Sequence, residues 1–109
     1  MFTIDNDTNT MTIVKKDTAS FNVALDNYSL MDGDKVTFTI ATEVEQEKPL
    51  KQIVVEDFYN GIATVMISSE DSNIEAGNYL YDIQINTADG RVDTIVGPAK
   101  FKVIGGVTY

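Results

Sequence analysis

The residue types that most often carry catalysis or bind metals are scarce in this chain. It contains no Cys and no His, which excludes disulfides, thiolate sites and the commonest general base. No Ser or Lys lies in a Gly-x-Ser-x-Gly or Ser-x-x-Lys setting that would activate a nucleophile. The carboxylate pairs Glu56-Asp57 and Glu70-Asp71 are adjacent in sequence, so in a strand their members would point to opposite faces. We therefore predict no catalytic residue, and a protein that is not an enzyme.

Two Asp-rich segments, residues 5–9 and 32–34, invite a calcium interpretation because hard cations prefer carboxylate and amide oxygens. A calcium loop needs Gly at its sixth position, and here that position is Thr10 or Thr37. Asx side chains also favour turns by bonding to the nearby backbone. We interpret both segments as turns and predict no metal site and no cofactor.

Composition narrows the possible partners. The chain has 17 acidic and 8 basic residues, a formal charge of −9, and such a charge repels phosphate backbones. It has no basic stripe for a membrane surface, no export signal at its start and no apolar run of membrane-spanning length. We expect no nucleic-acid partner, no membrane partner, and synthesis in the cytoplasm.

The segment from Gly77 to Arg91 organises the rest of the sequence. It reads as one long strand ending in an Asp-Gly turn, with Tyr79, Tyr81 and Ile83 on one face. The Asn60-Gly61 pair between two apolar runs is a strong hairpin signal. Other alternating or β-prone segments predict strands at residues 2–4, 10–15, 20–25, 35–42, 51–58, 62–68, 91–96 and 99–104.

About eight or nine short strands with no helical periodicity predict an all-β protein, an antiparallel β-sandwich. Ile74-x-x-Gly77-x-Tyr79 has the spacing of a tyrosine corner, which favours the immunoglobulin-like version. We expect Gly77 and Tyr79 to form this corner, with Tyr79 buried and its hydroxyl bonded within residues 72–77. Pro98 should break the last strand and place it along an edge. The sandwich should span residues 1–104, followed by a flexible tail at residues 105–109.

A family resemblance adds to these predictions. The segments 77–85, 89–95 and 101–103, together with 33–40 and 58–63, resemble small tail-associated proteins of phages and prophages of Gram-positive bacteria. The pattern is similar to the immunoglobulin-like N-terminal domain of phage baseplate upper proteins. The resemblance covers residues 33 to 104 and implies a non-catalytic virion structural module. It also implies phage tail or baseplate proteins as partners and a location in the virion tail.

Two kinds of surface could bind a partner protein. One is a free sheet edge, for which the N-terminal strand segment Met11, Thr12, Ile13 and Val14 is our candidate, and which would also permit a homo-oligomer. The other is the set of loop tyrosines, Tyr28, Tyr59 and Tyr109, which could anchor a protein or cover an open end of the sandwich. Because tyrosines also stack on sugars, a carbohydrate or cell-surface binding module is the alternative function.

Overall fold

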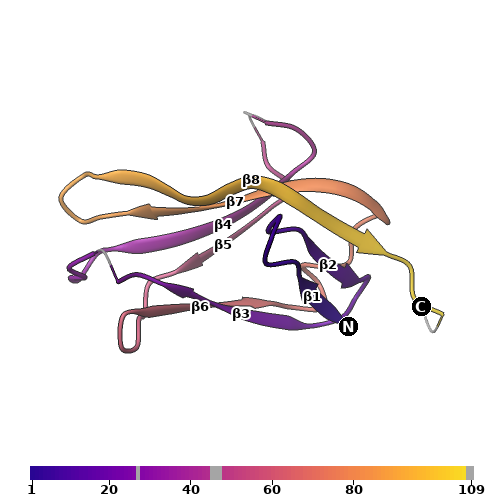
Figure 1. Cartoon of the computed structure of the whole chain (residues 1–109), viewed down its shortest axis with the longest axis horizontal. Helices are drawn as coiled ribbons and strands as arrows, with labels where there is room; N and C mark the ends of the chain where they lie inside the picture. Colours follow the sequence, from indigo (N-terminus) through magenta and orange to yellow (C-terminus); the bar gives the residue numbers. More distant parts are fainter. Residues whose placement is uncertain (27, 45–47, 108–109) are drawn as a thin grey trace.

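The computed structural model describes residues 1–26, 28–44 and 48–107, and in these it is all-β, without a helix (Figure 1). This confirms the predicted fold class. The eight strands are β1 (Phe2–Ile4), β2 (Met11–Val14), β3 (Ala19–Ala24), β4 (Lys35–Ala41), β5 (Lys51–Val55), β6 (Ile62–Ile67), β7 (Gly77–Asn86) and β8 (Val92–Ile104).

The strands form two sheets. The larger has the order β1-β2-β8-β7-β4-β5, and the smaller pairs β3 with β6. The pairing of β4, β7 and β8 opposite a β3–β6 pair is the arrangement of an immunoglobulin-like sandwich. All pairs are antiparallel except β2 with β8, which run parallel, so the fully antiparallel prediction is wrong at that one place.

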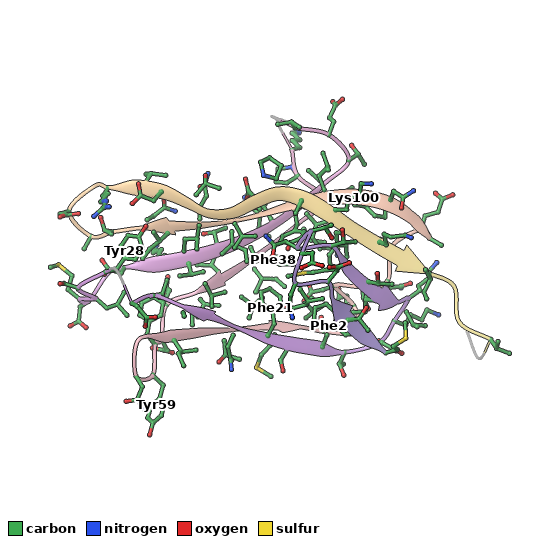
Figure 2. All side chains as sticks on the ribbon, viewed as in Figure 1. Phe2, Phe21, Tyr28, Phe38, Tyr59 and Lys100 are labelled. Carbon is green, nitrogen blue, oxygen red and sulfur yellow. The ribbon has the colours of Figure 1, made fainter. Side chains whose placement is uncertain are left out.

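Alternating side chains explain how the sheets close on one another. In β4 the side chains of Val36, Phe38 and Ile40 are fully buried, while the residues between them face outward. Phe38 stacks edge-on against Phe21 of the smaller sheet, with ring centroids 5.3 Å apart, and so joins the two layers (Figure 2). The remaining large core residues are Met11, Ile13, Val23, Leu25, Val65, Ile67, Tyr81, Ile83, Ile85, Phe101 and Val103.

Strand β8 is continuous, so the break predicted at Pro98 is wrong. A bulge accommodates the proline: Tyr81 pairs with Ala99 and Ile83 pairs with Val96, which leaves two β8 residues opposite one on β7. Gly97 reaches the required backbone with a φ of +97°. Residues 101–103 of β8 pair with both β7 and β2. Pro98 lies before the part that pairs with β2 and inside the bulge, so its missing N–H costs no ladder bond.

The N-terminal hairpin forms as predicted, with Phe2 opposite Ile13. Its second strand is not an edge, because β2 lies between β1 and β8. Met11 and Ile13 are buried in the core, and Thr12 and Val14 are half-buried. The prediction that Met11 to Val14 presents a free edge is therefore wrong, and the outer strands of this sheet are β1 and β5.

The Asn60-Gly61 turn forms, but it does not join two paired strands. Tyr59 and Ile62 bond to each other across the turn at 3.0 and 2.9 Å, and pairing stops there. β5 ends at Val55 and pairs with β4, whereas β6 pairs with β3. The predicted hairpin is therefore a crossing from one sheet to the other.

Candidate functional site

Three connections meet at one end of the sandwich, drawn at the left of Figure 1. They link β3 to β4, β5 to β6, and β7 to β8. We call residues 28–34, 56–61 and 87–91 the loop end. In immunoglobulin variable domains, loops at one end of the sandwich carry recognition, since strands hold their bases rigid while their tips can vary.

Asp34 holds two of these connections together. Its side chain is fully buried; one oxygen accepts the N–H of Met31 at 3.0 Å and the other accepts the N–H of Ala88 at 2.7 Å. The adjacent Gly33 has a φ of +96° and sits so close to Ala88 that an added Cβ would lie 3.1 Å from the alanine Cβ. A side chain at position 33 would thus strain the backbone and press the two connections apart.

The 87–91 turn is tied within itself. The N–H of Thr87 donates to the Arg91 carbonyl at 2.8 Å, and the Arg91 N–H donates to the Thr87 hydroxyl oxygen at 2.9 Å. The Thr87 hydroxyl donates to Asp89, and this bond is the main reason that the pKa of Asp89 is lowered. The turn therefore keeps its shape without help from a ligand.

Tyr28 is held against the start of β8. Its hydroxyl donates to the Asp93 carboxylate at 2.9 Å, and Arg91 binds the same carboxylate at 2.8 Å. The Arg91 guanidinium also lies 5.1 Å from the centre of the Tyr28 ring. The bond to Asp93 raises the pKa of Tyr28, because an ionised tyrosine would face a carboxylate. Tyr28 is thus half-buried against the core, and both its hydroxyl and its ring already have contacts within the protein.

Tyr59, unlike Tyr28, is exposed to solvent. It stands at the tip of the β5–β6 connection with its side chain directed away from the sheets (Figure 2), and it is 80% exposed. Asn60 and Gly61 follow it with φ values of 51° and 73°, the left-handed backbone that a tight turn needs. Met31 on the β3–β4 connection is likewise 57% exposed. The loop end therefore offers two large apolar side chains to a partner.

Two hollows flank Met31. The larger, of about 580 Å³, lies between the β3–β4 and β5–β6 connections and is lined in part by Leu30 and Phe58. The smaller, of about 240 Å³, reaches Tyr28 and Arg91. Around the larger hollow, Asp32, Glu56 and Asp57 outnumber Lys35, whose ammonium lies 3.6 Å from Glu56. The rim is therefore acidic.

This surface does not assemble a metal centre. In residues 1–26, 28–44 and 48–107, no three carboxylates, His or Cys are grouped as metal ligands. Asp34 already uses both oxygens on backbone N–H groups.

No helix in the described part of the chain is long and apolar enough to cross a membrane.

The predicted corner lies at the other end of the molecule. The Tyr79 hydroxyl donates to the Glu75 carbonyl, inside the 72–77 turn, and Gly77 begins β7. Tyr79 itself is half-buried, so the expectation of a buried side chain is wrong. The reason is its position near the start of β7, whereas Tyr81, two residues on, is fully in the core and donates to the Asn9 carbonyl.

Sequence reasoning selected Tyr28 and Tyr59 for this site but not Asp34, Arg91 or Asp93. Asp34 was considered only as part of a turn or calcium segment. The bonds from Asp34 to Ala88 and from Tyr28 to Asp93 span 54 and 65 residues, distances over which no local pattern gives a signal. Tyr109 lies outside the described residues.

Fold and site together define an all-β, immunoglobulin-like sandwich with a rigid, acidic loop end carrying exposed apolar side chains. Comparisons with protein-family models, with curated proteins and with solved structures each found no match for the chain.

Proposed function

We propose that this protein is a non-catalytic module that works by protein–protein contact, and that the loop end is its contact surface. The observation that carries the proposal is the pair of exposed side chains, Met31 and Tyr59, at one end of the sandwich. Asp34 holds the connection that carries Met31, and the paired backbone bonds between Tyr59 and Ile62 close the turn that carries Tyr59. Met and aromatic residues are enriched in interfaces. Loops held in place before binding lose less entropy when a partner arrives.

The resemblance of residues 33 to 104 to phage and prophage tail proteins supports a setting for this contact. On that basis the partners are proteins of a phage tail or baseplate, and the module is a structural part of the virion. Self-association through a sheet edge belongs to the same proposal, with β5 as an outer strand in place of the interior β2.

A carbohydrate or cell-surface binding function is the second candidate, because the exposed ring of Tyr59 could stack on a sugar. Of the two loop tyrosines, only Tyr59 supports sugar binding. The hydroxyl of Tyr28 is bonded to Asp93 and Arg91 lies against its ring, which leaves Tyr59 as the platform.

The test is to co-express the chain with each protein encoded beside its gene and to look for co-elution in size-exclusion chromatography. The double variant Met31→Ala, Tyr59→Ala should lose the complex. Met66→Ala is the matched control, since Met66 is 71% exposed on β6. A complex that survives the double variant, or no complex with any of these proteins, would refute the proposal. Binding on a glycan array that requires Tyr59 would instead favour the second candidate.

A further inference from the structure

A third hollow lies on the outer face of the larger sheet, the face turned away from β3 and β6. It is lined by Ala41 of β4, Leu80 and Asp82 of β7 and Pro98 of β8, together with Val44 and Pro49. Val44 and Pro49 belong to the connection between β4 and β5, and the described parts of this connection project above the sheet in Figure 1. We call this hollow, of about 310 Å³, the outer groove.

Asp82 is the unusual residue in the outer groove. It occupies an outward position of β7, between the buried Tyr81 and Ile83, yet it is itself half-buried. Among the hydrogen bonds and ion pairs of the part of the chain that the structure describes, none involves its carboxylate. Partial burial raises the pKa of Asp82, because one side of its carboxylate has lost contact with water.

The bulge in β8 explains why Asp82 is sheltered. Gly97 approaches β7 so closely that an added Cβ would lie 2.6 Å from the Tyr81 carbonyl oxygen and 3.1 Å from the Asp82 Cβ. Pro98 follows and lines the same groove. The backbone of β8 therefore covers one side of Asp82, and the groove leaves its other side open.

We propose that the outer groove binds a Lys or Arg side chain of a partner protein. The described lining residues include two carboxylates, Asp82 and Glu43, and no Lys or Arg is among them. An ammonium or guanidinium would give Asp82 the charged hydrogen-bond donor that it lacks. The apolar walls would cover the methylene stem, as happens when long basic side chains pack along apolar surface.

The chain's own basic residues do not fill this role. Lys100 lies on β8 opposite Leu80 and is the nearest candidate by register, but the ion pairs of the described residues do not join it to Asp82. A basic side chain of a second copy is also a poor match, since the chain has 8 basic residues against 17 acidic ones. The occupant is therefore a different protein, and the proposal does not depend on the loop end.

The test is a nuclear magnetic resonance titration of the full chain with blocked tripeptides at millimolar concentrations. The probe is acetyl-Leu-Lys-Leu-amide, with the Arg analogue alongside. Two matched peptides separate the two parts of the proposal. Leu-Gln-Leu removes the charge, and a peptide with 2,3-diaminopropionic acid in place of Lys keeps the ammonium but removes most of the methylene stem. We expect shifts of the Leu80, Asp82 and Gln84 amides, and binding at least about tenfold weaker for both matched peptides.

The protein variants complete the design. Asp82→Asn preserves shape and should weaken the Lys peptide at least about tenfold. Asp7→Asn removes the same charge from an exposed turn far along the chain and should leave binding unchanged. No shift with any peptide, equal binding to the Gln peptide, unaltered binding by Asp82→Asn, or shifts spread over all acidic segments would each overturn the proposal.

Discussion

Replacing Asp34 by Ala should destabilise the protein far more than a surface substitution does. The change removes one fully buried carboxylate and leaves two backbone N–H groups, of Met31 and Ala88, without their acceptor. A hydrogen bond to a charged group contributes about 1.5 kcal/mol or more, so the two together are worth about 3 kcal/mol. This is a large part of the roughly 5–15 kcal/mol that holds a domain folded.

Urea unfolding followed by circular dichroism measures this loss, and thermal unfolding should show a midpoint lower by about 12 °C. Asp32→Ala is the matched control, because Asp32 is an exposed carboxylate in the same connection. Asp34→Asn retains one acceptor oxygen and should fall between the two. Amide exchange should quicken at Met31 and Ala88, since the bond between their connections is lost.

An Asp34→Ala variant as stable as Asp32→Ala would refute this reasoning. It would mean that water reaches both N–H groups once the carboxylate is gone, so that Asp34 contributes little to global stability. Unchanged global stability with fast exchange confined to the two connections would place the role of Asp34 in local order alone.

Three further substitutions give expected outcomes by urea unfolding. Tyr79→Phe removes the hydroxyl that donates to the Glu75 carbonyl. Because the side chain is half-buried, this substitution should lower the free energy of unfolding by about 0.5–1.5 kcal/mol. An unchanged urea midpoint would contradict the assignment of the tyrosine corner. Burial raises the pKa of Tyr81, so the folded state holds the hydroxyl proton of Tyr81 more tightly than the unfolded state does. The stability that this provides should be complete below about pH 10 and should fall as the pH rises through the folded pKa. Tyr81→Phe should reduce that fall. Burial also raises the pKa of Asp82 above 3.8, because the charged carboxylate is disfavoured in the folded protein. The contribution of Asp82 to stability is therefore complete only below that pH and is lost as the carboxylate ionises. Asp82→Asn should stabilise the protein at pH 7 but not at pH 3, and equal effects at both pH values would contradict the raised pKa.

The individual strands were predictable because alternation is a local property. Val36, Phe38 and Ile40 of β4 alternate with small polar residues, and all three are buried. Ala63, Val65 and Ile67 of β6 are likewise buried, and Thr64 and Met66 between them are exposed. A strand that covers a core on one face carries this pattern within its own few residues, whatever it pairs with.

Pairing was less predictable because it depends on residues far away. The Asn60-Gly61 signal was correct for the turn, yet β5 and β6 belong to different sheets. A turn fixes the direction of the chain over a few residues, whereas the choice of sheet is made by β4 and β3, the strands that β5 and β6 join. Pro98 likewise marked an irregularity, and the neighbouring Gly97 decided that it would be a bulge.

The candidate site also combines features that local sequence predicts with features that depend on distant residues. Tyr28 and Tyr59 were equivalent as loop tyrosines in the sequence. Arg91 and Asp93 separate them, since they hold Tyr28 against β8, whereas Tyr59 stays 80% exposed. Local residue type predicted where an aromatic side chain would stand, and only the folded chain shows whether it is free to bind.

The interior position of β2 also changes how edge contacts can be tested. Deleting residues 1 to 16 would remove Met11 and Ile13 from the core, so lost association would report unfolding and not a lost edge. The outer strands are β1, with three residues, and β5, with five. Very short edge strands are a common device against pairing with other chains. Because Val54 on β5 is also half exposed, pairing with another chain is better matched to β5, and point substitutions there test it without disturbing the core.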